Sequence, residues 1–366
     1  MARPNNCPPV LFLVFNRPDY AGVVFEAIRQ AAPQRLYIAA DGPRDRPGEA
    51  ELCAKVREVT TAVDWECEVK TLFRDENLGC GKGVSSGVSW FFENEEAGIV
   101  LEDDCLPSMS FFRYCEELLE TYRDDPRVLA ISGSNFQRGQ PVMSDSYFFS
   151  RQAHCWGWAS WRRAWNQYDF EMSHWPAFRD GGGLRAWSIG NPVFEDYWTL
   201  VMDKTADKEV DTWDYQWILT GWLHNGLTCT PVRNLVTNVG IGPTGAHPTT
   251  GDYWFSHQPA AELEFPLKHP QLLAWNAVAD EIADWERYNI KPFDSGREAE
   301  EKLVQAMDQM EEITHQFRAA RAELGDKSRQ LVQAKNTINR MEASRFWKLR
   351  DKFASTARYF GIRGGD

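Results

Sequence analysis

Metal-binding and disulfide patterns are missing from this sequence. The 366-residue chain has eight cysteines, but none forms a Cys-x-x-Cys pair and no Cys/His cluster has the spacing of a zinc site. A disulfide framework is not expected in a chain of this length. These absences argue against a zinc module and favour a reduced, cytosolic environment.

Long apolar runs and an excess of positive charge are missing too. The run VLFLVF at 10–15 is too short for a signal-peptide core or a membrane span, and no other segment approaches a span. The net charge of −13 argues against a nucleic-acid partner. We therefore expect a cytoplasmic protein that does not bind nucleic acid.

Apolar strands and helical segments alternate through the first 135 residues. The expected strands are 10–15, 35–42, 66–74, 98–104 and 127–134, and the expected helices are 19–31, 48–62, 83–95 and 108–123. Near-continuous apolar strands separated by helices predict an α/β fold with a mostly parallel sheet covered on both faces.

The composition changes after residue 135. Of the sixteen tryptophans, ten lie between 156 and 222, which predicts a second region at 136–257. Within it, 154–165 and 213–226 are expected to be helical and 227–240 to form strands around a turn. Prolines and weak periodicity mark 258–297 as a connector.

Residues 298–344 carry an apolar residue every seven positions. The repeat consists of Leu303, Met310, Phe317, Leu324, Leu331 and Ile338. This spacing predicts a coiled coil that makes the protein a homo-oligomer. The alternative is a long amphipathic helix that packs back on the same chain.

The tail, 345–366, combines basic residues with bulky aromatic ones. A helix of this kind can lie on an anionic membrane, which would place the protein peripherally on the inner face of the membrane. The alternative is a basic helix packed against the acidic remainder of the chain.

Polar groups follow the expected strands where each strand ends. Glu102, Asp103 and Asp104 follow the apolar run GIVL, Asn16 and Arg17 follow the first strand, and Asp41 follows the second. Ligands bind at the carboxyl ends of parallel strands. Carboxylates at such an edge can share Mn²⁺ or Mg²⁺ with a diphosphate, although an acidic triplet can also be a solvated turn.

The glycine-rich stretch NLGCGKG at 77–83 is not a phosphate-binding P-loop. The P-loop pattern requires Gly at position 76 and Ser or Thr at position 83, but these positions are Glu76 and Gly83. Asn77 and Lys82 remain candidates for contact with a phosphate or a base, and a simple turn is the alternative.

Together, FNRPDY, AADGPR, ENLGCGKGVSSG and LEDDCLPSMSFF resemble the nucleotide-sugar half of GT-A-type glycosyltransferases. The last stretch is similar to the N-acetylglucosaminyltransferase I branch, and bacterial family-two-type transferases are also similar. The resemblance covers about 1–250. It implies a Rossmann-like GT-A fold whose nucleotide-sugar-binding half is 1–135 and whose acceptor half is 136–257.

The resemblance also implies roles for the residues at the strand ends. Asp104 would bind the metal, Glu102 and Asp103 would contact the donor sugar and ribose, and Asp41 would contact the base. Arg17 would lie near the base or the phosphates.

Later acids and one histidine complete the set that the resemblance implies. Asp211 or Asp214 would be the catalytic base, and we favour Asp214 because it lies between two tryptophans and begins a helical run. His247, in the stretch GPTGAH, would reach the metal or would be an ordinary loop residue.

The tryptophan-rich half suits an acceptor site, because aromatic rings stack on the C–H faces of sugars. The candidates are Trp156, Trp158, Trp161, Trp213 and Trp217. The alternative for most of them is a place in the core.

The expected reaction is inverting, metal-dependent transfer of a sugar, with UDP-sugar the favoured donor. The acceptor would be a hydroxyl of a glycan, a lipid or a protein. One rival is a nucleotidyltransferase, although FNRPDY lacks the glycine-rich loop typical of that class. The other is a coiled-coil scaffold with a degenerate transferase domain.

Overall fold

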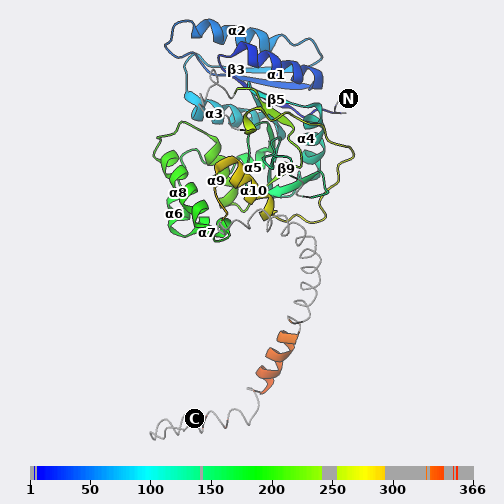
Figure 1. Ribbon diagram of the computed structural model, residues 1–366, viewed down its shortest axis with the longest axis vertical. Coiled ribbons are helices and arrows are strands. Elements are labelled where there is room, and N and C mark those ends of the chain that lie inside the picture. Colours follow the sequence, from blue (N-terminus) through cyan, green and yellow to red (C-terminus); the bar gives the residue numbers. More distant parts are fainter. Residues whose placement is uncertain are drawn as a thin grey trace. The chain divides into compact units, whose positions relative to one another are not determined.

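A mixed sheet of eight strands forms the centre of the first of two compact units, Met1–Gly296 (Figure 1). The computed structural model describes Pro4 and residues 6–140, 143–240, 254–292, 327, 330–341, 349 and 352. The strands are, in order across the sheet, β3 (Glu68–Phe73), β2 (Arg35–Ala40), β1 (Val10–Val14), β4 (Ala97–Glu102), β8 (Trp158–Trp161), β6 (Val128–Ser132), β9 (Leu227–Pro231) and β7 (Tyr147–Ser150).

Most strands of this sheet run in one direction. The pairs β3–β2, β2–β1, β1–β4 and β6–β9 are parallel, whereas β8 is antiparallel to both of its neighbours and β7 is antiparallel to β9. A second, two-stranded sheet pairs β5 (Cys105–Pro107) with β10 (Val236–Asn238). The prediction of an α/β fold with a mostly parallel, Rossmann-like sheet is therefore confirmed.

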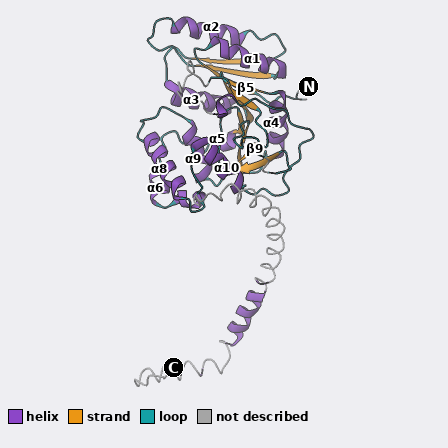
Figure 2. Ribbon diagram, in the orientation of Figure 1, coloured by secondary structure: helices purple, strands orange, loops and turns teal. Residues whose placement is uncertain are grey.

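Helices cover both faces of the sheet, as Figure 2 shows. One face packs on α1 (Pro18–Ala31), α2 (Glu49–Thr61) and α4 (Met109–Thr121). The other packs on α3 (Gly79–Asn94), α5 (Arg162–Trp165), α6 (Trp175–Asp180), α7 (Gly183–Ser188), α8 (Pro192–Ala206) and α9 (Asp214–Leu223). The remaining helical elements are η1 (Trp254–His257) and α10 (Ala277–Tyr288).

The alternation of side chains along β1 explains why both faces are covered. Phe12 belongs to the core beneath α1 and α4, and its neighbours Leu11 and Leu13 belong to the core beneath α3. Successive residues of a strand point to opposite faces, so a strand that is apolar throughout needs cover on each side.

The prediction of a helix over 154–165 is wrong for most of that segment. Residues Trp158–Trp161 form β8, which inserts between β4 and β6, and only the last four residues are helical. Every residue of β8 is buried. A short apolar segment that is buried on both faces can be a strand or a helix, because its hydrophobic pattern is the same in both. The sequence therefore did not distinguish β8 from a helix.

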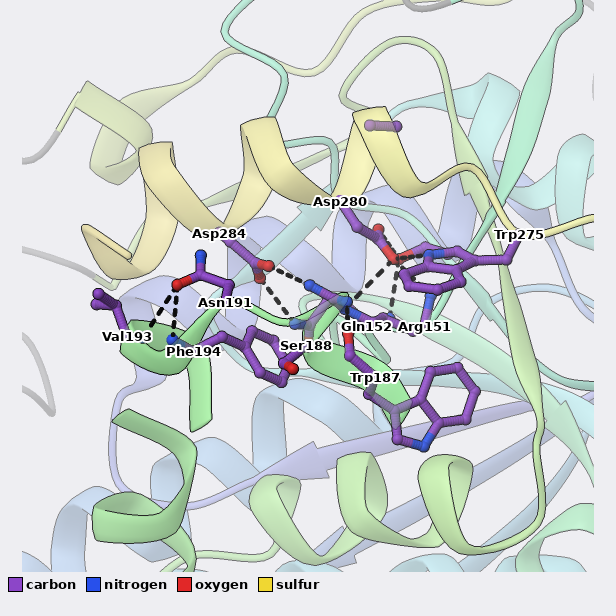
Figure 3. A network of polar contacts seen from close by, with 12 residues as sticks. Arg151, Gln152, Trp187, Ser188, Asn191, Val193, Phe194, Trp275, Asp280 and Asp284 are labelled. Carbon is purple, nitrogen blue, oxygen red and sulfur yellow. Dashed lines mark hydrogen bonds and ion pairs between the residues drawn. The ribbon is translucent and has the colours of Figure 1, made fainter. Parts of the chain in front are cut away.

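The prediction that 258–297 is only a connector is also wrong, because it contains α10. Figure 3 shows how Asp280 and Asp284 of this helix meet the buried Arg151 that follows β7. Asp280 accepts hydrogen bonds from the backbone N–H of Arg151 at 2.8 Å and from Trp275 Nε1 at 2.6 Å. Asp284 accepts one from Gln152 Nε2 at 2.9 Å. Buried ionic contacts therefore fix α10 to the sheet edge.

The second unit is Arg297–Asp366, and the predicted coiled coil and basic tail lie largely outside the described residues. Residues 330–341 are helical, and Leu331 and Ile338 are exposed on this single chain. Among the helices that the structure describes, none has both the length and the apolar content needed to cross a bilayer.

Candidate active site

The order of the strands creates a crevice between β1 and β4. From β1 the chain moves outward to β2 and β3, then crosses back to place β4 on the other side of β1. The connections leave the carboxyl ends of β1 and β4 in opposite directions, and ligands bind at such a switch point. A pocket of about 430 Å³ lies here, and we call it the switch-point pocket.

Predicted donor, metal and base residues meet in this pocket, although they come from distant parts of the chain. Its lining includes Arg17, Asp41, Asn77, Glu102, Asp103, Asp104, Asp211 and Asp214. Strand ends supply most of these side chains, the loop before α9 supplies Asp211, and Asp214 is the first residue of α9.

Arg17 holds two members of the acidic triplet. Its Nη2 forms a close ion pair with Asp103 Oδ1 and lies 3.1 Å from Asp104 Oδ2. Burial acts to lower the pKa of Arg17, but the two carboxylates outweigh burial and raise the pKa above its usual value. The backbone N–H of Phe15 also donates to Asp103 Oδ2 at 3.3 Å. The end of β1 is thereby tied to the end of β4.

Glu102 is the member of the triplet that is left unpaired. No described residue forms an ion pair or a hydrogen bond with its carboxylate. Burial raises its pKa well above the usual range, and Asp104, Asp103 and Asp214 raise it further. Burial also raises the pKa of Asp103, to about 6, despite the opposing effect of Arg17. The acids are therefore close enough to repel one another.

Asp41 organises the loop that follows β3. It accepts hydrogen bonds from Asn77 Nδ2 at 3.0 Å, from the backbone N–H of Leu78 at 3.0 Å and from that of Gly79 at 3.2 Å. Asn77 also donates to the carbonyl of Gly42 at 2.8 Å. Asp41 and Asn77 thus act together to shape one wall of the pocket.

Asp211 caps the beginning of α3 from a distant part of the chain. Its two oxygens accept the backbone N–H groups of Cys80 at 2.9 Å and of Gly81 at 2.8 Å. Gly79 has φ +79°, and a Cβ there would come within 2.5 Å of Asp211 Oδ2, so glycine is required. Both oxygens of Asp211 are engaged, which makes it a poor candidate for a base.

Asp214, at the start of α9, keeps one oxygen available. Its Oδ1 accepts the hydroxyl of Thr212 and the backbone N–H of Tyr215, the latter at 3.0 Å. Its Oδ2 accepts no hydrogen bond from any described residue. An oriented carboxylate with one unused oxygen facing a pocket is suited to accept a proton.

The five candidate tryptophans divide into two groups. Trp156 and Trp213 line the switch-point pocket. Trp158, Trp161 and Trp217 do not line it and, like Trp213, are at most 2% exposed. These three tryptophans are part of the core, which was the alternative to acceptor contact that the sequence left open. Trp156 is partly exposed, so contact with an acceptor is open chiefly to Trp156, whereas Trp213 lines the pocket with only 2% of its surface exposed.

Two further predicted residues do not line the pocket, and a third cannot be placed. Asn16 donates from Nδ2 to Glu49 at 3.0 Å, and so lies behind the lining. Lys82 is exposed on α3. His247 lies outside the described residues.

Phe15, Arg44 and Arg74 also line the pocket, although no role was assigned to them from the sequence. The guanidinium of Arg44 lies 5.0 Å from the centre of the Phe15 ring and is held by the buried Glu49. Arg74 donates from Nη2 to Ser86 at 2.7 Å. Arg44 belongs to AADGPR and Phe15 to FNRPDY, so their positions after strand ends were the available signal.

The lining also fits a divalent cation. Three arginines face six carboxylates in the pocket, and the carboxylate oxygens are the hard ligands that Mn²⁺ and Mg²⁺ prefer. In the part of the chain that is described, no group of three or more His, Cys, Asp and Glu side chains is arranged to enclose a metal by itself. Such ions commonly take one or two protein carboxylates and complete their shell with phosphate and water.

No protein-family model matches the chain, and no curated protein sequence is similar to it. Solved structures match parts of it. A mannosyltransferase from Pyrobaculum calidifontis in complex with GDP-Man and Mn²⁺ is 14% identical with a TM-score of 0.28, covering 44% of this chain and 46% of that one. The match therefore spans less than half of the mannosyltransferase.

Two other solved structures show likeness of the same order. HddC from Yersinia pseudotuberculosis is 11% identical with a TM-score of 0.28, covering 47% of this chain and 86% of that one. A UDP-glucose pyrophosphorylase complexed with UDP-glucose is 9% identical with a TM-score of 0.22, covering 43% and 70%. At these TM-scores the likeness is too slight to support an assignment of function.

Proposed function

We propose that this protein is an inverting, metal-dependent glycosyltransferase that uses a nucleotide-diphosphate sugar, with UDP-sugar the favoured donor. The observation that carries the proposal is the meeting of Arg17, the acidic triplet, Asp41 and Asp214 in one pocket at the switch point of the sheet. The motif resemblance to GT-A enzymes supports the same proposal.

The donor would lie along the ends of β1, β2 and β4. The Phe15 ring with its stacked Arg44 offers an apolar face and a cation for the nucleotide, and Asp41 with Asn77 offers hydrogen-bonding groups to its base. Arg17 and Arg74 supply positive charge that the diphosphate needs in a pocket rich in acids.

The unpaired carboxylate of Glu102 and the partly exposed carboxylate of Asp104 are the groups that would hold a divalent cation. When bound, the cation would neutralise the negative charge of the diphosphate and of the carboxylates around it. Burial, and after it the neighbouring carboxylates, raise the pKa values of Glu102 and Asp103, and a bound cation would offset the repulsion between these carboxylates.

Asp214 is the proposed base. Its free Oδ2 would accept the proton of an acceptor hydroxyl while that oxygen attacks the anomeric carbon of the sugar. The bond between the anomeric carbon and the diphosphate oxygen breaks on the opposite face, which inverts the configuration. The electron pair leaves with the nucleoside diphosphate, and the proton is on Asp214 at the end of the step.

Asp211 acts by position rather than by touching the substrate. It fixes the start of α3, and with it the glycine loop whose first residues are bonded to Asp41. Asp214, the first residue of α9, follows Asp211 by three residues. Asp211 therefore connects the glycine loop, which forms the donor wall of the pocket, to the proposed catalytic base.

The acceptor is a hydroxyl of a glycan, a lipid or a protein, and Trp156 is the partly exposed ring of the lining that is open to it. We also propose that 298–344 makes the protein a homo-oligomer and that 345–366 binds an anionic membrane surface. The exposed, helical residues Leu331 and Ile338 lie seven apart, which supports the first of these two proposals.

Product analysis tests the reaction class. The full chain is incubated with Mn²⁺ and a panel of UDP- and GDP-sugars, and the products are separated. Release of a nucleoside diphosphate that Asp214→Asn abolishes supports the proposal. Release of pyrophosphate from a nucleoside triphosphate and a sugar phosphate would instead identify a nucleotidyltransferase, and no turnover of any donor would favour a scaffold.

A further inference from the structure

Arg287, near the end of α10, lies among four aromatic rings. Its guanidinium carbon is 4.4 Å from the ring centre of Phe255, 4.9 Å from Trp156, 5.5 Å from Phe136 and 5.6 Å from Tyr288. We call these five residues the Arg287 cluster. The rings also pack on one another, with 5.4 Å between the centres of Phe136 and Trp156. The cation is therefore held by a preformed aromatic surface.

Among the residues that the structure describes, no carboxylate pairs with Arg287. The adjacent Glu286 is paired with Arg138, whose Nη1 lies 3.5 Å from its Oε2. Arg287 itself forms no ion pair and no hydrogen bond with any described residue, although it is half-buried. Contacts with rings hold the plane of a guanidinium but leave its N–H groups unused. The described residues therefore leave its N–H donors available to an anion.

The Arg287 cluster borders the switch-point pocket, because Trp156 belongs to both. The pKa of the neighbouring Cys155 thiol also indicates that Arg287 is close to the pocket. Burial raises the pKa of Cys155, Asp214 and Glu102 raise it further, and Arg287 lowers it. One pocket-lining group thus lies within electrostatic range of the proposed base, the acidic triplet and Arg287.

The Arg287 cluster lies on the side of the pocket near the proposed catalytic base, Asp214, rather than on the side proposed for the nucleotide. The groups proposed for the nucleotide follow β1 and β2, whereas Trp156 precedes β8 and Arg287 belongs to α10. Tyr215, next to Asp214, is also within range of both charges, since burial and Asp214 raise its pKa and Arg287 lowers it. A molecule that delivers a hydroxyl to Asp214 would approach past these residues.

We propose that the Arg287 cluster is an acceptor subsite for a sugar that carries an anionic oxygen group, either a carboxylate or a phosphate. The Trp156 ring stacks on the C–H face of the sugar, and the guanidinium forms paired, charge-assisted hydrogen bonds with the anion. The inference rests on the proposed glycosyl transfer, and it specifies the acceptor as acidic.

Binding of small acidic sugars to the full chain tests the subsite. Saturation-transfer NMR titrations compare glucuronic acid and glucose 6-phosphate with neutral methyl glucoside, which separates a carboxylate from a phosphate as the preferred group. The variants are Arg287→Gln, Arg287→Lys and, as a matched control, Arg138→Gln, which removes a nearby arginine that has a carboxylate partner. Melting temperatures of all variants are recorded in parallel.

We expect wild type and Arg138→Gln to bind at least one acidic sugar about tenfold or more tightly than methyl glucoside. Arg287→Gln should remove this preference while methyl glucoside binds as before, and Arg287→Lys should keep part of it. If Arg287→Gln does not fold, the lysine variant decides, because it retains the charge over the rings but loses the paired geometry. A wild type without acid preference, or a preference that survives in both variants, overturns the inference.

Donor binding, measured on the same samples with UDP-glucose and Mn²⁺, separates this inference from the proposed function. Acid preference that depends on Arg287 in a protein that binds no nucleotide sugar would support the subsite and reject the transferase. Donor binding without acid preference would reject the subsite and leave the transferase standing.

Discussion

Replacing Asp211, which precedes α9, and Asp214, the first residue of α9, tests which of the two is the catalytic base, and the structure gives a different expectation for each. In Asp211→Ala, α3 loses both of the bonds that Asp211 makes to the backbone N–H groups of Cys80 and Gly81. The helix has no side-chain cap of its own at Leu78. Removing a helix cap costs about 0.5–2 kcal/mol.

The size of this effect follows from exposure. Asp211 is exposed, so water replaces part of what is lost, and we expect about 1 kcal/mol for Asp211→Ala and less for Asp211→Asn, which keeps one acceptor oxygen. In a unit of this size that lowers the melting temperature by about 2–4 °C. Asp75→Asn, at an exposed acid in the nearby loop, is the control and should leave the melting temperature unchanged.

Turnover should show the opposite order. Asp214→Asn removes the free Oδ2 that would accept the proton and should lower kcat by about 10²-fold or more, with donor affinity near that of wild type. Asp211→Asn should retain most of the turnover. Donor turnover and thermal melts on the same preparations are the assay. If Asp211→Asn loses as much activity as Asp214→Asn at an unchanged melting temperature, Asp211 is the base and our interpretation of its two hydrogen bonds is wrong.

Gly240→Ala should weaken nucleotide-sugar binding, measured by calorimetry, at least about tenfold without unfolding the protein. The reason is that the new Cβ would overlap the Asp104 carboxylate and lie 2.8 Å from Arg17 Nη1. An affinity equal to that of wild type would contradict this prediction. Burial raises the pKa of Asp284 to about 7 even though Arg151 opposes the shift, so the folded state holds this proton more tightly than the unfolded chain, whose Asp has a pKa near 3.9. The free energy of unfolding of wild type relative to Asp284→Asn should therefore fall as pH rises from about 4 to 7, by at most about 1.4 kcal/mol per pH unit, and stay level above pH 7. Urea melts measure this difference, and the exposed Asp207→Asn is the control. A difference that does not change with pH would refute the prediction. A chain truncated after residue 297 should be monomeric by light scattering and keep its turnover, whereas an unchanged oligomer would reject the coiled-coil assignment.

The sequence predicted the elements whose patterns are local. The five strands and four helices expected in the first 135 residues are found near their expected positions, because mostly apolar strands alternate there with helices, although β3, EVKTLF, is only partly apolar. Elements that depend on tertiary context were mispredicted. The strand β8 is buried on both faces, so its pattern resembles that of a buried helix, and α10 follows a proline-rich stretch whose composition suggested a linker.

The site was predictable to a similar extent and for similar reasons. A polar group directly after a buried strand must lie at the carboxyl edge, which placed Arg17, Asp41 and the acidic triplet. The function of Asp211 as a cap for a helix 130 residues away could not be read from the sequence, because it depends on a contact between distant segments. Tryptophan composition likewise could not separate Trp156, at the pocket, from Trp158, in the core.

The central claim is that the switch-point pocket binds a nucleotide sugar together with a divalent cation through Asp104. The most direct test is isothermal calorimetry of UDP-sugars and GDP-sugars on wild type and Asp104→Asn, each with Mn²⁺ and with excess chelator. We predict saturable binding of a nucleotide sugar to wild type with Mn²⁺, lost in chelator and in Asp104→Asn at an unchanged melting temperature. Binding that is equally tight in Asp104→Asn or in chelator, or no binding of any nucleotide sugar to wild type, would contradict the account.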